Sequence, residues 1–338
     1  MTTTKKSRSF HSVSPRAAIA VGFTLCLPLT MTVSAAPLTP AEISDFKDTV
    51  GNRVETATIL GGDYGVGGGA YTSAGKANDN ADISVSKFGG SGVIGAPQPL
   101  GSLDIGWQPQ LQGSMGYLTA KNNFDSGLLN ADVDEYKTFA IQFGGGARFW
   151  FDDHFSIAPT FMGMYGHTED SYTARSAFGQ ANQAEATSLG LIGWTVDTWT
   201  IRPSLNLQYQ FTWKRTIFTL SSEPTYFHTE SFNSSSSSIG VNGDSATWEN
   251  KLDVDAPTGV ELFGHELRTG GFFDRTELYG NLRDGMSSDY LYEAHGRIVL
   301  DFLNQLWKVQ WIGVGVSHFW GEGEFNGWSY GADISFRF

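Results

Sequence analysis

The last thirteen residues, Asn326 to Phe338, alternate between two kinds of side chain. One row is apolar and rich in rings, and comprises Trp328, Tyr330, Ala332, Ile334, Phe336 and Phe338. The other row is small or charged, and comprises Gly327, Ser329, Gly331, Asp333, Ser335 and Arg337. Because successive side chains of a strand point to opposite faces, this pattern predicts a strand with one apolar face. Aromatic residues at both ends of the apolar row are typical of a transmembrane β-strand with a polar interior behind it.

Residues 1–35 have the features of a secretory signal peptide. Basic residues precede an apolar run over 17–29, and small residues at Val33-Ser34-Ala35 predict cleavage after Ala35. The apolar run is shorter than the ~20 residues that a spanning helix needs. The single cysteine, Cys26, lies within this leader, so the rest of the chain can form neither disulfides nor thiolate metal sites. These features predict export into the envelope of a Gram-negative bacterium.

The charge balance excludes one class of partner. The chain has 22 basic and 35 acidic residues, and four basic but no acidic residues lie in the predicted leader, so the remainder carries a net charge of −17. Such a surface does not favour nucleic acid. After the leader there is no run of ~18 consecutive apolar residues, and therefore no predicted transmembrane helix.

Alternating segments continue through most of the chain. They predict an all-β, antiparallel transmembrane β-barrel of twelve strands over residues 81–338. The expected strands are 81–88, 100–107, 110–119, 136–151, 155–165, 199–211, 216–228, two within 260–282 split near Gly270, 290–302, 306–320 and 326–338. The alternative is fourteen strands, with two more drawn from Glu55 to Tyr71. Long loops are expected over 168–193 and 233–255, the second of which contains the serine run Ser234–Ser238.

Residues 36–80 do not show the alternating pattern that predicts barrel strands. Pro40 to Val50 predicts a short helix, and Gly61 to Gly69 is too rich in glycine for a central strand. We expect this segment to lie in the periplasm or to enter the lumen as a plug.

Four segments resemble the solitary outer-membrane autotransporter-type β-barrel family. They are Glu266–Arg275 (ELRTGGFFDR), Asp289–Ala294 (DYLYEA), Leu306–Lys308 (LWK) and Gly327–Gly331 (GWSYG). The resemblance implies a twelve-stranded, autotransporter-like barrel without a passenger, located in the Gram-negative outer membrane among lipid and lipopolysaccharide. The end of the chain resembles the signal that the barrel-assembly machinery reads, which would use Tyr330, Ile334, Phe336 and Phe338. We expect a monomer with a structural or narrow-pore role.

Catalytic signatures are weak. The histidines after the leader lie outside HExxH, GxSxG and EF-hand patterns, so no catalytic residue, cofactor or metal is expected. The alternative is an outer-membrane lipid or peptide hydrolase with a loop or lumen active site. Such an enzyme could use His167 beside Glu169 and Asp170, or His295 with a serine distant in sequence.

Charged residues on the polar rows are the candidate site. We expect Arg148, Arg202, Glu293, His295, Arg297, Asp301, Asp333 and Arg337 to face the lumen. Charged groups in a barrel interior either pair with each other or line a water-filled path. Both signs are mixed here, which favours pairing, but the sequence leaves a selective solute pathway open.

Overall fold

The computed structural model describes residues 40–62, 66–74, 79–101, 104–124, 130–306, 309–322 and 325–336. The predicted signal peptide and its cleavage position lie outside these residues, as do Arg337 and Phe338. No helix in these ranges has the length and apolar character required to cross a membrane.

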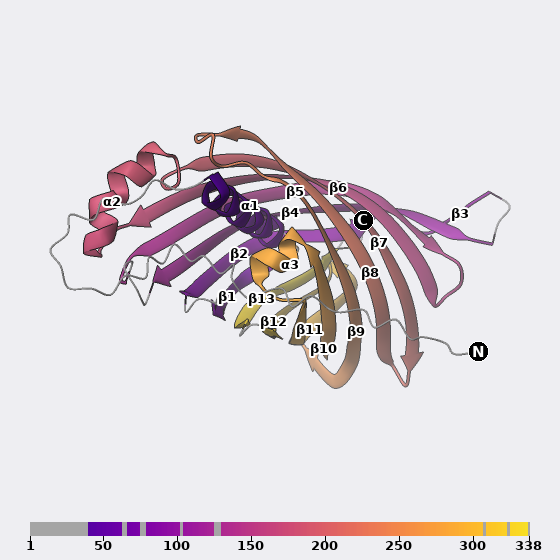
Figure 1. Cartoon of the computed structure of the whole chain (residues 1–338). Coiled ribbons are helices and arrows are strands. Elements are labelled where there is room, and N and C mark those ends of the chain that lie inside the picture. Colours follow the sequence, from indigo (N-terminus) through magenta and orange to yellow (C-terminus); the bar gives the residue numbers. More distant parts are fainter. Residues whose placement is uncertain are drawn as a thin grey trace, which may run out of the picture.

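Within the described residues, twelve antiparallel strands form a closed barrel, as predicted (Figure 1). The wall strands are β1 (Val66–Ala74), β2 (Asp79–Val93), β4 (Gly106–Phe124), β5 (Val133–Trp150), β6 (Phe155–Thr173), β7 (Thr195–Trp213), β8 (Thr216–Ser234), β9 (Asn242–Leu262), β10 (His265–Gly280), β11 (Tyr290–Leu306), β12 (Val309–Gly321) and β13 (Asn326–Phe336). Each strand pairs with its sequence neighbour along the wall, and β1 closes the ring by pairing with β13 on one side and β2 on the other. The two-residue strand β3 (Gln98–Pro99) pairs only with the start of β4.

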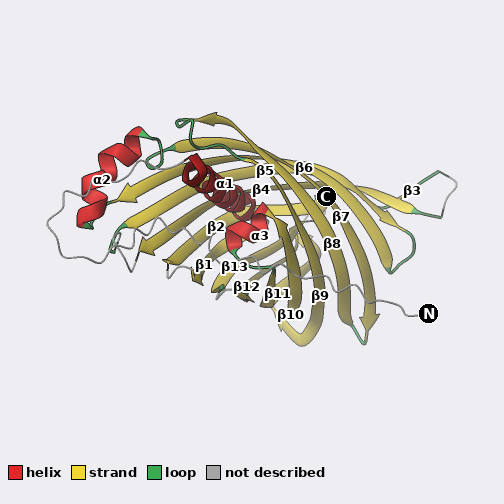
Figure 2. Cartoon of the chain, viewed as in Figure 1, coloured by secondary structure: helices red, strands yellow, loops and turns green. Residues whose placement is uncertain are grey.

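The two ends of the barrel differ. At one end, here called the short-turn end, the connections are tight, as at 151–154, 214–215 and 263–264. At the other, the long-loop end, the connections are longer and two of them contain helices. These helices are α2 (Ala177–Ser188), between β6 and β7, and α3 (Asn281–Met286), between β10 and β11. A third helix, α1 (Pro40–Gly62), lies inside the ring of strands beside α3 (Figure 2).

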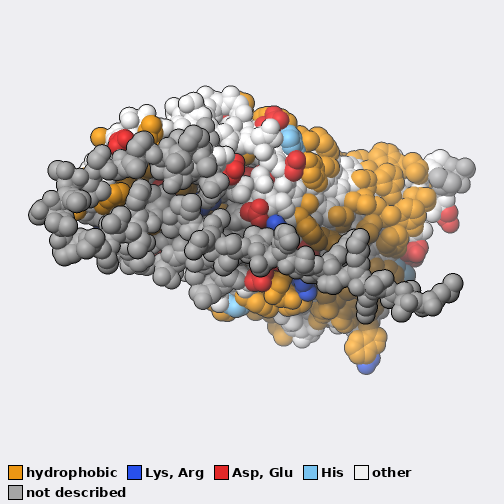
Figure 3. Space-filling model, in the orientation of Figure 1, with side chains coloured by type: hydrophobic (Ala, Val, Ile, Leu, Met, Phe, Trp, Pro, Cys, Tyr) orange, Lys and Arg blue, Asp and Glu red, His pale blue; other side chains and the backbone are white. Residues whose placement is uncertain are grey.

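The outer face of the wall is apolar. Phe143, Phe161, Val314 and Tyr330 each expose more than half of their side-chain area on the outward rows. In the view of Figure 3, apolar side chains gather over the part of the barrel toward β3, whereas polar side chains gather near α1. Large apolar side chains exposed in this number would be unfavourable in water. They are what the lipid-facing band of a transmembrane barrel requires.

The Gly-rich stretch contains a wall strand, which corrects the expected boundary of the barrel at residue 81. β1 begins at Val66, so the barrel includes part of the segment that was assigned to the periplasm or a plug. Glycine is needed at this seam because neighbouring backbone lies close. A Cβ on Gly67 would lie 2.3 Å from the carbonyl oxygen of Tyr330, and one on Gly327 would lie 2.6 Å from that of Ala70.

Four other predicted boundaries differ from the structure, although the total of twelve strands is confirmed. The predicted strand 100–107 is replaced by the β3 turn, and Trp107 belongs to the long strand β4. The predicted loop over 233–255 is largely β9, which starts at Asn242. The turn that we placed near Gly270 lies instead at Phe263-Gly264, where both residues have positive φ. The long loop over 168–193 is shorter than expected, since β6 runs to Thr173 and α2 occupies much of the remainder.

One buried carboxylate anchors the α2 loop. Asp132, with no exposed surface, accepts hydrogen bonds from the backbone N–H groups of Arg175 and Ser176, both at 2.6 Å, and from the hydroxyls of Ser176 and Tyr172. Burial favours the neutral acid, but the bonds from Ser176, Tyr172 and Arg175 favour the carboxylate more strongly. The pKa of Asp132 is therefore lowered from its ordinary value.

Closure through β1 leads to a test by deletion. Deleting residues 40–62 removes α1 and leaves all twelve wall strands, whereas deleting 40–74 also removes β1. We expect the first variant to keep the heat-dependent mobility shift of a folded barrel in SDS gels. The second should lose that shift because β2 and β13 keep unpaired backbone groups. A normal shift for the 40–74 deletion would show that β1 does not close the ring.

The α2 loop should respond to pH through Asp132. Because its pKa is lowered in the folded chain, its stabilisation is complete above the ordinary value of about 3.9 and is lost as the pH falls below it. We expect Asp132→Asn to accelerate proteolysis within 174–194 several-fold at pH 7, and the difference from the parent protein to shrink near pH 3. Glu185→Gln, on the exposed face of α2, is the matched control and should cleave at the parent rate. Equal rates for all three proteins at pH 7 would contradict the anchor.

Candidate functional site in the barrel lumen

Helix α1 fills the long-loop half of the lumen. Its first buried turn packs Val50 and Val54 against an apolar cluster formed by Tyr136, Trp194, Val196, Ile239 and Val241. Farther along, Ile59 packs against a second cluster, formed by Phe227, Leu278, Leu282, Met286 and Phe325. Residues 54–59 are all buried, so the helix is enclosed on every side rather than lying on one face of the wall. The helix predicted over 40–50 extends to Gly62 and lies inside the ring of strands.

Several polar groups of α1 have hydrogen-bond partners on the wall or on α3. Glu55 is fully buried, and its carboxylate accepts hydrogen bonds from the Ser245 hydroxyl at 2.6 Å and from the Asn281 amide at 2.9 Å. The hydroxyls of Thr58 and Thr198 lie 3.3 Å apart. At the end of the helix, the Ser114 hydroxyl donates to the carbonyl of Gly62. A buried carboxylate without such donors would be costly, so these contacts fix the position of the helix along the lumen.

Threonine hydroxyls line the wall beside the helix. Thr138 pairs with Thr168 at 2.9 Å, and Thr200 pairs with Thr229 at 2.8 Å, all on inward rows of β5 to β8. These residues expose at most 1% of their surface. Their hydroxyls satisfy each other across strands, which leaves a small-residue surface on which a helix can pack closely.

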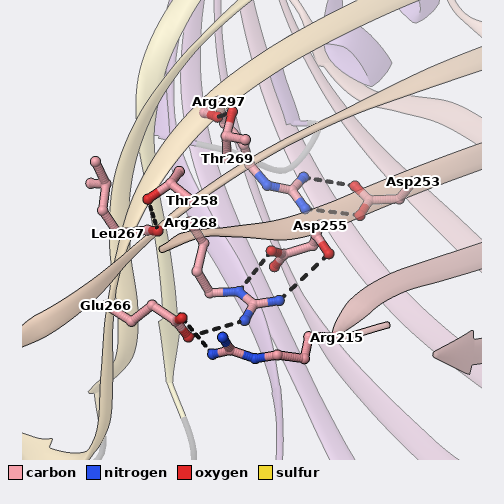
Figure 4. Close-up of polar contacts among 9 residues, drawn as sticks. All are labelled: Arg215, Asp253, Asp255, Thr258, Glu266, Leu267, Arg268, Thr269 and Arg297. Carbon is pink, nitrogen blue, oxygen red and sulfur yellow. Dashed lines mark hydrogen bonds and ion pairs between the residues drawn. The ribbon is translucent and has the colours of Figure 1, made fainter. Parts of the chain in front are cut away.

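Ion pairs cover the inner wall toward the short-turn end. Arg297 of β11 contacts both carboxylate oxygens of Asp253 of β9, at 2.7 and 2.8 Å. Arg268 of β10 donates to Asp255 at 2.7 Å and lies 3.5 Å from Glu266, which also accepts from Arg215 at 2.5 Å (Figure 4). We refer to Arg215, Asp253, Asp255, Glu266, Arg268 and Arg297 as the ion ladder. Both signs are balanced within it, so it needs no external counter-charge.

The predicted lumen residues are mostly on inward rows but not in one cluster. Arg297 belongs to the ion ladder, whereas Arg148 and Arg202 each contact a glutamine side chain. Arg148 donates to the Gln208 side chain, and Arg202 donates to Gln142 at 3.2 Å. Asp301 lies opposite Glu266 and Trp311 in the sheet register. Asp333 pairs with Gly313 through the backbone, and its side chain and Arg337 lie outside the described residues.

Glu293 and His295 meet at one serine. The Nδ1 atom of His295 lies 2.7 Å from the Ser317 hydroxyl of β12, and Glu293 is hydrogen-bonded to the same hydroxyl. The imidazole of His295 also stacks on Phe272, with 4.7 Å between ring centroids. The structure therefore brings these two predicted residues together on neighbouring positions of the lumen wall.

The residues proposed as an assembly signal lie on the closing strand. Tyr330 is outward and exposed on β13. Ile334 and Phe336 share that strand by backbone position, while Phe338 lies outside the described residues.

His167 is not in a loop but on the outer face of β6. Its imidazole contacts Asp197 at 2.6 Å and Glu169 at 3.3 Å. His228 of β8 repeats this arrangement with Asp244 at 2.9 Å and Glu230 at 3.3 Å. Both rings are thus bonded to carboxylates outside the lumen, away from His295. Asp170, the other acid suggested for a loop site, is buried and points inward on the same strand.

Sequence reasoning missed the acidic and basic residues of β9. Glu249, Lys251, Asp253 and Asp255 alternate with Trp248, Leu252 and Val254, which is a strand pattern with a charged inner row. The serine run before it and its high charge content conceal this alternation, so the sequence predicts a loop here. In the described parts of the chain, no group of three or more His, Cys, Asp or Glu side chains could hold a metal ion.

The lumen also contains a cavity of about 470 Å³ next to α1. It lies between the helix and the strands from β6 around to β2, and α3 covers one side of it. Charged side chains and apolar side chains line different parts of this cavity.

Breaking the ion ladder should destabilise the barrel more than breaking an outer pair. Arg297→Gln leaves Asp253 without its bidentate partner in a mostly buried position, and we expect a loss of about 1–3 kcal/mol in the free energy of unfolding. Arg275→Gln removes an exposed outward pair with Glu277 and should cost less than about 1 kcal/mol. Urea unfolding in detergent, followed by tryptophan fluorescence, measures both. Equal losses would show that the ladder contributes no more than a surface pair.

Comparison with known proteins agrees with this architecture. The family model described as the solitary outer membrane autotransporter beta-barrel domain matches residues 99–330. Among curated proteins, none matches the sequence.

Two solved autotransporter structures have a similar fold. The β domain of the Bordetella autotransporter BrkA is 12% identical with a TM-score of 0.50, and the match covers 81% of this chain and 99% of that one. The transport unit of the autotransporter AIDA-I from Escherichia coli is 9% identical with a TM-score of 0.56, covering 87% and 99%. At such identities the likeness concerns the fold alone. The family match extends over more than half of the chain, and the protein therefore belongs to the solitary outer-membrane autotransporter β-barrel family and is an integral protein of the Gram-negative outer membrane.

Proposed function

We propose that this protein is a passive outer-membrane barrel, a narrow pore that its own helix α1 holds closed. The observation that carries this proposal is the enclosure of residues 54–59 of α1, among which Val54, Glu55 and Thr58 expose 1% of their surface or less. Short turns of bacterial barrels face the periplasm, so α1 closes the half of the lumen toward the cell exterior. The ion ladder then lies toward the periplasmic end, and the cavity lies beside the helix.

Closure should be the stable state. Withdrawing α1 would expose Val50, Val54 and Ile59 to water, and burial of such side chains contributes roughly 1.5–3 kcal/mol each. It would also separate Glu55 from Ser245 and Asn281. The same placement fits a barrel that once threaded a segment through its lumen, since α1 runs from the long-loop mouth inward.

The partners follow from this role. We infer that outer-leaflet lipopolysaccharide and lipid surround the apolar band, and that the barrel-assembly machinery recognises the closing strand during insertion. The wall is closed and the ion ladder balances its own charges. A single chain therefore pairs its own strand edges and the charges of the ladder, which supports a monomer.

A lipid or peptide hydrolase is the weaker candidate. It has one supporting observation, the contact between His295 and Ser317. A hydroxyl has a single proton to donate, and Glu293 is hydrogen-bonded to the same hydroxyl as His295. A Ser317 proton that is donated to Glu293 is not donated to His295, which is what a general base needs.

Conductance of the refolded protein in planar bilayers tests the closed pore. We expect the full barrel to be silent for most of the recording, and the variant lacking 40–62 to conduct steadily. A deletion of 177–188, which removes α2 from an outer loop, is the matched control and should stay closed. Steady conductance by the full barrel would refute closure by α1, and silence of the 40–62 deletion would refute the pore.

A further inference from the structure

The cavity next to α1 has two chemically different parts. One part is apolar and is formed by α1, α3 and the adjoining strand ends, through Leu60, Tyr71, Leu278, Leu282, Met286, Phe319 and Phe325. Within this part, Tyr71 stacks on Phe325 at 5.7 Å and meets Phe319 edge-on at 5.2 Å. The rings provide flat surfaces suited to a ring or an alkyl chain.

The other part of the cavity is charged and has an excess of carboxylates. Its acidic side chains are Glu223, Glu249, Asp274 and Glu293, and its cations are Lys87, Arg202 and Lys251. One lysine serves two of the acids, since Lys251 lies 2.7 Å from Glu249 and 3.9 Å from Asp274. Four carboxyl groups thus face three cationic side chains, and the low dielectric of the enclosed lumen strengthens the effect of such groups on a ligand.

Ring faces add to the attraction for a positive charge. The ammonium of Lys251 lies 4.5 Å from the centroid of Phe272, and the guanidinium of Arg202 lies 5.6 Å from that of Phe227. Both rings line the cavity, so cations are already held against ring faces there. The lining therefore already holds cationic groups by combining carboxylates with ring faces, which is the chemistry that a ligand ammonium group would need.

We propose that this cavity binds a small organic cation, namely an amine with an aromatic or alkyl body. The ammonium would lie by Glu223 and Glu293, and the body would lie against the apolar part beneath α1 and α3. A volume of about 470 Å³ is within the range of small-molecule pockets. The inference rests on the proposed closed lumen, because α1 and α3 form the apolar part. Entry would be from the short-turn end.

Binding of two matched probes tests the proposal. 4-Phenylbutylamine and 4-phenylbutyrate have the same body and opposite charges. In isothermal titration calorimetry of the refolded full chain in detergent, we expect saturable binding of the amine and at least tenfold weaker binding of the carboxylate. Glu293→Gln should weaken amine binding about three- to tenfold. Glu277→Gln, which changes an outward-facing carboxylate, should bind the amine like the parent protein.

The controls keep this test separate from that of the closed pore. If Glu293→Gln fails to show the folded gel mobility, Glu223→Gln takes its place, with the same expected loss. Equal affinity for both probes, or unchanged amine affinity in the folded carboxylate variant, would overturn the cation site. Conductance is recorded without any probe, so a conducting parent protein that still binds the amine selectively would refute closure and leave the cation site standing.

Discussion

A strand in hydrocarbon must pair its backbone N–H and C=O groups with other strands, and the seam through β1 is where this chain meets that demand. Without β1, both β2 and β13 would present an open edge to lipid. The seam depends on glycine, because Gly67 and Gly327 lie against neighbouring carbonyl groups that a side chain would displace. Glycine weakens a strand in water, yet these glycines allow the barrel to close. Pairing of backbone groups in lipid outweighs the conformational entropy that glycine loses on folding.

Closure in turn makes a polar helix stable in the lumen. Helix α1 contains Glu55, Thr56 and Thr58, which could not face lipid, and each of them is buried inside the ring. The wall meets the helix with threonine pairs on one side and with Ser245 and Asn281 on another. The fit is one of shape and hydrogen bonding more than of hydrophobicity, which explains why the helix has no pronounced apolar stripe in its sequence.

Much of the wall could be predicted because lipid enforces strict alternation. The rows containing Phe139, Ile141 and Phe143 on β5, or Ile312, Val314 and Val316 on β12, are readable without a structure. β1 and β9 were missed because alternation there is carried by glycine or by charges, which also occur in loops. Inward orientation of Arg297 was predictable, but its partner Asp253 was not, because pairing across strands depends on a register that a single sequence does not encode. The same limit applied to Glu55, whose partners lie about two hundred residues away.

The two halves of the lumen satisfy their polar groups by different means. The contacts that keep α1 in the lumen are therefore separate from the ion pairs that stabilise the barrel wall. Around α1, threonine hydroxyls of the wall bond to each other across strands and keep these bonds whether or not the helix is present. Toward the short-turn end, the ion ladder balances its own charges and makes no use of the helix. Glu55 is the one acidic residue of 50–62. Its two hydrogen bonds connect the helix to β9 and to α3. The cost of moving the helix is thus concentrated at its own apolar and acidic groups, while the barrel around it keeps its internal contacts.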